Sequence, residues 1–466
     1  MRKDNTQAAF NILSQLILNG TNFVLIMIFT RFLSTSDYGI VSLFQAYALF
    51  FTIIVGLNVQ GSIGTAFVHI NEKEQNNYLS SIMLLAVIFF CIITAISIIL
   101  IQPFKQFSEL SSPLIILMLC YSFGTFAFNF VNIKYVYLRK SQFSCLIALI
   151  IALSMIILSW VGVRNQEKLG IQPYVLRILS ITIPYLICAC YVVVTIFFKG
   201  NPFIGLKKYW TFCLPICIPL VFHGISQIIL GQTDKIMIQK LLNDNGLVGI
   251  YSFIVTFVHV LNSVYTALNN TWVPIYYDYT KNKEFDMIEK RSGRYCNLFL
   301  CLCIGFMFVS PELVKMFADS NYWSGIKLIP LIVLSVFFTF LYSFAVNYEL
   351  YFRKTKWIAV GTSLAALSNI VLNALFIPKF KLIGAAVATL LSYLLLFVFH
   401  QLCAFAIKTD SAYPYKFNFF IKRIAVIFIA IFIFGLTRNI FIVRWLITVI
   451  VGFYLLLNIK KNRSIF

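Results

Sequence analysis

The chain has 466 residues, of which 60% are hydrophobic, 17% aromatic and only 11% charged. A soluble domain carries about 25% charged residues, so this composition excludes an ordinary soluble protein. The net charge of +21 does not indicate nucleic-acid binding, because the basic residues stand singly between apolar runs and form no patch or stripe.

Apolar runs of about 20 residues recur along the chain, which is typical of a polytopic helical membrane protein. The first run continues to Leu33 without a small-residue cleavage site, so it predicts a membrane span and not a cleaved signal peptide. The spans are predicted over residues 9–32, 40–66, 79–101, 113–136, 143–163, 173–198, 210–235, 248–272, 294–317, 327–349, 357–377, 382–407, 419–437 and 441–459, fourteen in all.

The loops between these spans predict the orientation. Most of the 37 lysines and arginines fall in cytoplasmic segments if the N-terminus is cytoplasmic, so both termini are predicted inside. The longest loop, "YYDYTKNKEFDMIEKRSGR", is predicted to form an amphipathic helix on the membrane surface. The eleven cysteines lie mostly within spans and lack metal-ligand spacing, so we predict neither disulfides nor a metal site.

An internal repeat follows the first and the seventh spans. "RFLSTSDYGIVSLFQ" aligns with "KLLNDNGLVGIYSFIV" when one gap is allowed, matching Gly39 to Gly249 and Ser42 to Ser252. The copies lie six spans apart and so share one orientation, as in transporters built from parallel repeats. The repeat predicts an N-terminal lobe over 1–200, a C-terminal lobe over 201–409 and two appended helices over 410–466.

Four spans carry polar residues at helical spacing, so that each set shares one face. Such stripes either join helices by hydrogen bonds or line a water-filled cavity. Stripes on the equivalent spans 1 and 7 favour a shared central cavity. The stripes are Asn11, Gln15, Asn19 and Asn22 in span 1; Ser122, Thr125, Asn129 and Asn132 in span 4; His223, Gln227 and Asp234 in span 7; and His259, Asn262, Thr266 and Asn269 in span 8.

Charged residues in or near spans are further candidates for a site. Arg31 and Lys134 lie near span ends, where snorkelling also explains a cation. Arg177 lies about one turn into span 6. Asp234 and Lys235 are adjacent in span 7 and point about 100° apart, so they do not form a ready-made ion pair.

The other titratable groups suggest no catalysis. Glu349 and Arg353 are four residues apart and are expected to pair locally, and His400 is expected to be satisfied in packing. No carboxylate pair suited to acid–base chemistry, nucleophile motif or phosphate loop occurs, so we predict no catalytic residue.

Three stretches carry a family resemblance: "LSTSDYGIVSLFQ", "QTDKIMIQKLLNDNGLVGIYSF" and "NIVLNALFIPKFKLIGAAVATLLSYLLLFV". They resemble the polysaccharide transporter family, in its O-antigen flippase (Wzx-type) branch of the multidrug/oligosaccharidyl-lipid/polysaccharide exporter superfamily. The third stretch is the most specific, because Asn369, Asn373, Pro378 and Gly384 follow the family pattern "N…LN…IP…GAA.AT". Through its spacing and span count the resemblance covers nearly the whole chain.

The resemblance implies an all-α membrane fold with about 14 helices, in which two six-helix lobes enclose a central cavity with alternating access. The implied cargo is an undecaprenyl-diphosphate-linked oligosaccharide, such as an O-antigen repeat unit, moved from the cytoplasmic to the periplasmic leaflet of a bacterial inner membrane. Membrane lipid, a polysaccharide polymerase and a chain-length regulator are the implied partners. No cofactor is expected, and coupling to Na⁺ or H⁺ stays open.

Such a cargo needs amides and hydroxyls for its sugars and cations for its diphosphate. The stripes supply the first, and Arg31, Lys134, Arg177 and Lys235 are candidates for the second. Related flippases of lipid-linked precursors use cavity arginines on spans 1, 2 and 8. Here span 8 has His259 and span 2 has no cation, so that diphosphate clamp cannot be carried over residue by residue.

Three alternative functions remain. A cation-coupled multidrug exporter of the same superfamily has twelve spans and a carboxylate in its first bundle, whereas this first bundle has carboxylates only near span ends. Asp234 could still serve ion coupling. A membrane-embedded glycan polymerase or glycosyltransferase would need a larger outer loop. A peptidoglycan-precursor flippase shares the span count but lacks the "SDYGI" and "QTDKI" stretches.

Overall fold

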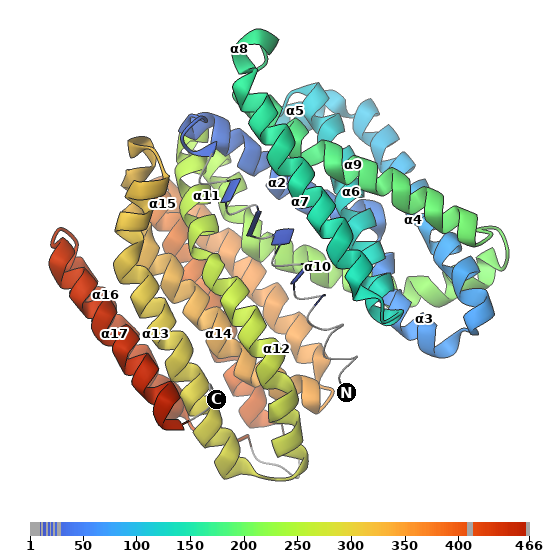
Figure 1. Cartoon of the computed structure of the whole chain (residues 1–466). Helices are drawn as coiled ribbons and strands as arrows, with labels where there is room; N and C mark the ends of the chain where they lie inside the picture. The colour runs from blue at the N-terminus through green and yellow to red at the C-terminus, as the bar shows by residue number, and fades with distance from the viewer. Residues whose placement is uncertain are drawn as a thin grey trace. The chain divides into compact units, whose positions relative to one another are not determined.

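The computed structural model describes residues 10, 13–14, 17–18, 20–21, 24–25, 29–407 and 413–462. The chain divides into two compact units, Met1–Ile236 and Met237–Phe466, whose boundary falls inside helix α10 (Figure 1). The lobe limits predicted from the sequence, 1–200, 201–409 and 410–466, stay a prediction.

Unit 1 is helical throughout its described residues. Within it, α6 packs against α2 and α9, and α7 packs against α9. Its elements are α2 (Thr35–Gly56), η1 (Val59–Ser62), α3 (Ile63–His69), α4 (Glu72–Ile99), α5 (Ile101–Ser108), α6 (Ser112–Tyr137), α7 (Ser141–Arg164), α8 (Gln166–Leu169), α9 (Pro173–Lys199) and most of α10 (Leu206–Leu242).

Unit 2 is also helical throughout its described residues. Within it, α14 packs along α15, and α13 contacts α12, α14, α16 and α17 (Figure 1). Its elements are α11 (Asn245–Val258), α12 (Val260–Lys281), α13 (Phe285–Phe317), η2 (Ser320–Leu328), α14 (Ile329–Tyr351), α15 (Thr355–Ala406), α16 (Phe417–Thr437) and α17 (Phe441–Asn462).

Twelve helices among the described residues are long and apolar enough to cross a membrane. One of them, α15, has 52 residues, or about 78 Å of helix, and contains both predicted spans 11 and 12. The predicted first span lies partly outside the described residues. Spans 2 to 14 each correspond to a long helix or to one limb of α15, which confirms the prediction of an all-α membrane protein.

The start of α2 shows why the "STSDYGI" stretch opens a helix. The Ser34 hydroxyl accepts a bond from the Asp37 backbone N–H, and Asp37 accepts one from the Ser34 N–H, which completes a capping box. In the matching repeat, Asp244 caps α11 by accepting from the Leu247 N–H at 3.0 Å. Both copies of the repeat therefore initiate a helix with an acidic side chain.

Two predicted spans are interrupted. Span 2 was predicted over 40–66, but α2 ends at Gly56 because Leu57 and Asn58 both adopt left-handed backbone angles. The amide of Asn58 then reaches the Leu220 carbonyl of α10 at 3.5 Å. Span 8 was predicted over 248–272, but two helices form it. His259 ends α11 and immediately precedes α12.

The predicted surface helix in the longest loop is wrong. Its residues belong to the ends of α12 and α13, which are joined by a short turn over 282–284. Tyr276 and Thr280 of this stretch are buried, and Arg291 lies over the Tyr279 ring at 5.2 Å. Packing within unit 2 has therefore extended both helices beyond the apolar segments that the sequence marks.

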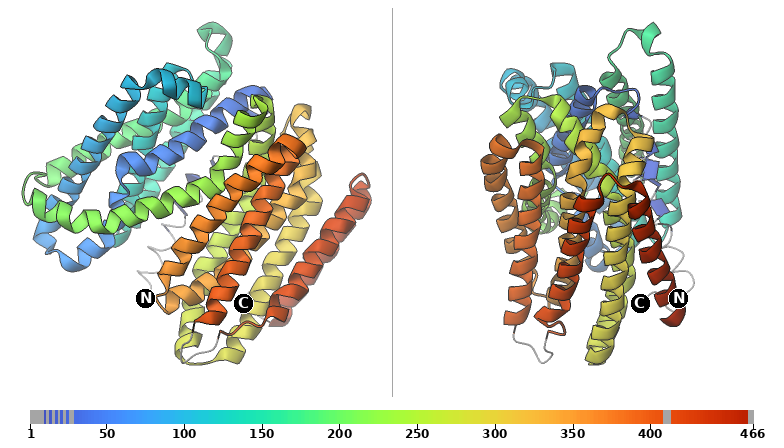
Figure 2. Two further views of the ribbon diagram at one scale, coloured as in Figure 1. Left: turned by 180° about the vertical axis from the view of Figure 1, so that it is seen from behind. Right: turned by 90° about the vertical axis from the view of Figure 1, so that its left-hand side faces the viewer.

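Helix α15 is a hairpin of two limbs, which lie side by side in both views of Figure 2. The limbs separate at Lys381, whose φ of 50° is not helical. Beyond the turn, Gly384 passes so close to Phe376 that a Cβ on it would lie 2.3 Å from the Phe376 carbonyl oxygen. At the other end of the hairpin, Gly361 faces His400. The small residues of "LIGAAVAT" thus permit the close approach.

We predict that Gly384→Ala destabilises the protein, although alanine is the better helix former. The added methyl group must displace backbone, and such overpacking costs about 1–3 kcal/mol. Gly435→Ala in α16 is the matched control, since nothing lies within 4 Å of a Cβ there. Thermal denaturation of the purified variants should show a lower midpoint for Gly384→Ala alone. Equal midpoints would contradict the hairpin packing.

Two arginines join the last two helices, α16 and α17, to α13. Arg423 of α16 donates to the Asn297 side chain at 2.8 Å and to the Gly293 carbonyl at 3.2 Å. Arg444 of α17 is 3% exposed and forms an ion pair with Glu312. These contacts explain why charges occur inside otherwise apolar helices, since each arginine finds its acceptors on the neighbouring helix.

Candidate functional site

The polar stripe predicted for span 1, Asn11, Gln15, Asn19 and Asn22, lies outside the described residues. Arg31 follows this span in the turn over 30–33, where its side chain is exposed. Phe29, the last helical residue before that turn, is 3% exposed. Its ring belongs to the packing around a buried arginine of the same unit.

That buried arginine is Arg177, in the second turn of α9 after Pro173. Its side chain is only 4% exposed, and its guanidinium carbon lies 4.7 Å from the Phe29 ring centroid. Nη1 donates to the hydroxyl groups of Ser159 on α7 at 3.3 Å and Ser180 at 3.4 Å. Within the described part of the chain no carboxylate pairs with it. An unneutralised buried cation is costly, so Arg177 is a candidate anion-binding group.

The stripe on α6 serves partly as helix–helix packing. The Ser122 hydroxyl donates to the Ala48 carbonyl of α2 at 2.9 Å, and Asn132 accepts a bond from the Ser144 hydroxyl of α7. Asn129 is half-buried. Hydrogen bonding between helices therefore accounts for Ser122 and Asn132 in this conformation, the first of the two roles that a polar stripe can have.

Lys134 is buried near the C-terminal end of α6, at 6% exposure. Its ammonium nitrogen lies 6.0 Å from the Tyr135 ring centroid, and Lys199 at the end of α9 is close enough to repel it. A snorkelling lysine would expose more of its side chain. About 33 Å of helix separates Arg177 from Lys199, so Arg177 and Lys134 lie near opposite ends of α9.

The candidates of span 7 all lie on the continuous helix α10. His223 is half-buried and Gln227 is exposed, while Asp234 is 5% exposed and Lys235 half-buried. The unbroken helix places His223, Gln227 and Asp234 on one face, as the spacing predicts. The structure therefore keeps this stripe intact as a set.

The candidates of span 8 all lie at the beginning of α12 or within it. His259 is exposed at the junction of α11 and α12, and Asn262 on α12 is half-buried. The Asn269 oxygen accepts from the Asn347 amide of α14 at 3.2 Å, so Asn269 joins two helices. His259 has a φ of −65° and a ψ of −7°, in the right-handed helical region, so it stays in helical register with Asn262 and Asn269.

Unit 2 contains a buried ionisable pair that was not predicted from the sequence. Glu349 of α14 and His400 of α15 are both fully buried, and the His400 Nδ1 lies 2.9 Å from a Glu349 carboxylate oxygen. The Tyr342 ring stacks on His400 at 5.8 Å. Glu349 therefore pairs with His400 and not with Arg353, which is exposed. Fifty residues of chain separate the partners, so local spacing could not reveal the pair.

Comparison with known proteins gives a family and a fold. A family model described as "Polysaccharide biosynthesis protein" matches residues 6–279. The structure resembles "Lipid II flippase MurJ, inward closed conformation", with a TM-score of 0.72 and 16% identity, covering 98% of this chain and 99% of that one. The search of curated protein sequences gave no match.

Multidrug transporters share the fold over a smaller part of the chain. An inward-facing MATE family transporter of the MOP superfamily matches with a TM-score of 0.60 and 14% identity, covering 85% of this chain and 94% of that one. A mutant form of the Vibrio cholerae MATE transporter VcmN matches with a TM-score of 0.52 and 10% identity, covering 86% and 96%. Since the family model spans more than half of the chain, this protein belongs to the polysaccharide biosynthesis protein family.

Proposed function

We propose that the protein is a flippase, which moves an undecaprenyl-diphosphate-linked oligosaccharide from the cytoplasmic to the periplasmic leaflet. Its family acts in polysaccharide biosynthesis, and the fold is that of a lipid II flippase. The match to the lipid II flippase covers 98% of the chain and must therefore include α16 and α17. The match to the MATE transporter covers 85% of the chain and can leave both helices out. This difference favours a lipid-linked cargo over a multidrug exporter.

The observation that carries the proposal is Arg177. A buried guanidinium with hydroxyl neighbours, and with no carboxylate partner among the described residues, is suited to an anionic group that arrives with the substrate. Its fork of N–H donors matches the oxygens of a diphosphate better than an ammonium does. In a multidrug exporter the same residue would repel cationic drugs. Access to Arg177 then requires helix movement, as alternating access supplies.

The proposal also includes the membrane, the residues that the glycan would contact and the partner proteins. We place the protein in a bacterial inner membrane with both termini cytoplasmic, as the distribution of basic residues predicts. The glycan would meet amides and hydroxyls, of which Asn129, Asn262 and Gln227 are at least partly accessible. A polymerase and a chain-length regulator would receive the flipped unit. The protein itself would catalyse no bond formation. If transport is coupled to an ion, that ion would be Na⁺ or H⁺.

The test is deletion of the gene, followed by extraction and mass measurement of lipid-linked oligosaccharides. We expect undecaprenyl-diphosphate-linked repeat units to accumulate in the deletion strain, and their mass identifies the glycan. Normal levels of these lipids together with lost ethidium efflux would establish the multidrug exporter instead. Accumulation of single repeat units at the periplasmic face would indicate a polymerase, because flipping would then be intact.

We expect Asp234→Asn to lower surface glycan while protein abundance stays near normal. Asp234 is buried on the α10 face that also carries His223 and Gln227, so loss of its charge acts on that face with little change in volume. Asp286→Asn on the exposed first turn of α13 serves as the control. Surface glycan is quantified, and an immunoblot measures the abundance of the protein. Less glycan at normal abundance would indicate a functional role for Asp234, whereas loss of the protein itself would indicate a structural one.

A further inference from the structure

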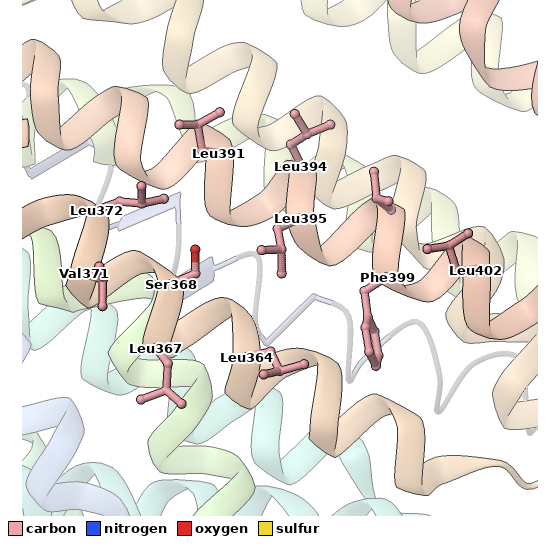
Figure 3. A pocket seen from close by; sticks show the side chains of 11 residues that line it. Leu364, Leu367, Ser368, Val371, Leu372, Leu391, Leu394, Leu395, Phe399 and Leu402 are labelled. Carbon is pink, nitrogen blue, oxygen red and sulfur yellow. The ribbon is translucent and has the colours of Figure 1, made fainter.

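The two limbs of α15 flank an open apolar groove in unit 2. It has a volume of about 840 Å³, and the Ser368 side chain is the polar group among the residues that line it. Figure 3 shows the aliphatic side chains that project from both limbs around this gap. Its most exposed lining residues are Leu364, Leu367 and Val371 on the first limb and Leu395 and Leu402 on the second.

A second hollow continues the groove toward the beginning of α15. It has a volume of about 490 Å³ and shares Phe399 and Leu402 with the first. Lys354 and Trp357 line its end, and both are exposed. An apolar groove that ends at a cation and an indole ring has the amphipathic character of a lipid with an anionic headgroup, because tryptophan and lysine both favour the membrane interface.

The length of the groove indicates which kind of lipid can fill it. From Lys354 to Val371 the first limb rises about 25 Å. The hydrocarbon core is about 30 Å thick, so a phospholipid chain anchored at Lys354 would end near the midplane, about 15 Å in. A polyprenyl chain is longer than one leaflet and can fill the groove to its far end.

Contact with apolar side chains alone would not retain a lipid there. Lipid tails are as apolar as leucine, so a lipid already in the bilayer gains little hydrophobic free energy by entering the groove. Retention must come from close packing along the groove and from the charge at its end. Both terms favour a long, branched chain that carries a phosphate.

We propose that this groove binds the polyprenyl chain of the lipid carrier, with its phosphate at Lys354 and Trp357. The inference rests on the proposed function, since it concerns the carrier of the same cargo. It adds a binding site formed by α15 of unit 2, with residues other than Arg177, which belongs to unit 1. On the predicted orientation Lys354 is cytoplasmic, so the groove would receive the carrier from the leaflet where the cargo is made.

Native mass spectrometry of the purified full chain with undecaprenyl phosphate tests the site, with phosphatidylglycerol as competitor. We expect Leu367→Trp, which fills the groove, and Lys354→Glu, which reverses the charge, each to weaken binding by about tenfold or more. Lys356→Glu and Phe432→Trp are the matched controls, because both residues are exposed and line neither hollow. Neither control should change binding.

Equal binding by all variants, or equal displacement by phosphatidylglycerol, would overturn the inference. Flipping of a labelled lipid-linked oligosaccharide by the same preparations separates this outcome from failure of the proposed function. If Leu367→Trp lost neither binding nor flipping, the groove would be an ordinary lipid-facing surface while the flippase function stood. If undecaprenyl phosphate bound the groove and no variant or wild-type protein flipped the cargo, the function would fail and the site would stand.

Discussion

Arg177→Leu is expected to lower the rate of flipping by about 10- to 100-fold, because a hydrogen-bonded contact to a charged group is worth about 1.5–3 kcal/mol. The same substitution should leave the thermal midpoint unchanged or raise it, since it removes a buried cation that has no carboxylate partner within the described residues. Flipping rates and thermal denaturation of one preparation measure both effects together.

The opposite directions of these two effects separate a binding role from a structural one. Arg177→Lys should retain part of the activity, because it keeps the charge and loses the planar fork. Arg164→Leu is the control, since Arg164 is exposed on α7 and stacks on Trp160. An Arg177→Leu protein that unfolds at lower temperature but flips normally would show that Arg177 only holds α7 and α9 together.

Breaking the Glu349–His400 pair should have the largest effect on stability. Both side chains are fully buried, so Glu349→Ala leaves the His400 Nδ1 without its partner at a cost of about 3–5 kcal/mol. We expect strongly reduced yield and a lower midpoint in thermal denaturation of the detergent-purified protein. The double variant Glu349→Leu with His400→Phe should recover most of the loss, because apolar groups of similar volume replace both partners.

Glu289→Ala provides the comparison for that series, since Glu289 is exposed on α13 and its replacement should change the midpoint little. Wild type, Glu349→Leu, His400→Phe and the double variant form a double-mutant cycle, from which the free energy of interaction follows. Additive effects of the two single substitutions would contradict the pairing seen between α14 and α15.

The helices could be predicted from the sequence because a bilayer restricts a spanning chain to long apolar helices. The turn at Lys381 falls between predicted spans 11 and 12, where Pro378 and two lysines interrupt the apolar run. The breaks after Gly56 and at His259 could not be predicted. At the first of them the Phe126 ring of α6 fills the space beside Gly56, a contact between residues 70 positions apart that local sequence does not reveal.

The candidate site was predicted less completely than the fold. Arg177 stood out because it is a charge within an apolar span, and the structure buries it. Helical spacing identified Asn132 and Asn269 but could not tell a cavity face from a packing face, and both turned out to bond to neighbouring helices. Glu349 and His400 each looked ordinary alone, because only the fold brings α14 and α15 together.

Flipping measured in proteoliposomes tests the central claim most directly. Purified protein is reconstituted with a fluorescently labelled undecaprenyl-diphosphate oligosaccharide, and membrane-impermeant dithionite then bleaches label in the outer leaflet only. The flippase account predicts that wild-type protein exposes nearly all of the label to dithionite and that Arg177→Leu leaves the inner-leaflet share protected. Protection of that share by wild-type protein, as in protein-free vesicles, would contradict the account.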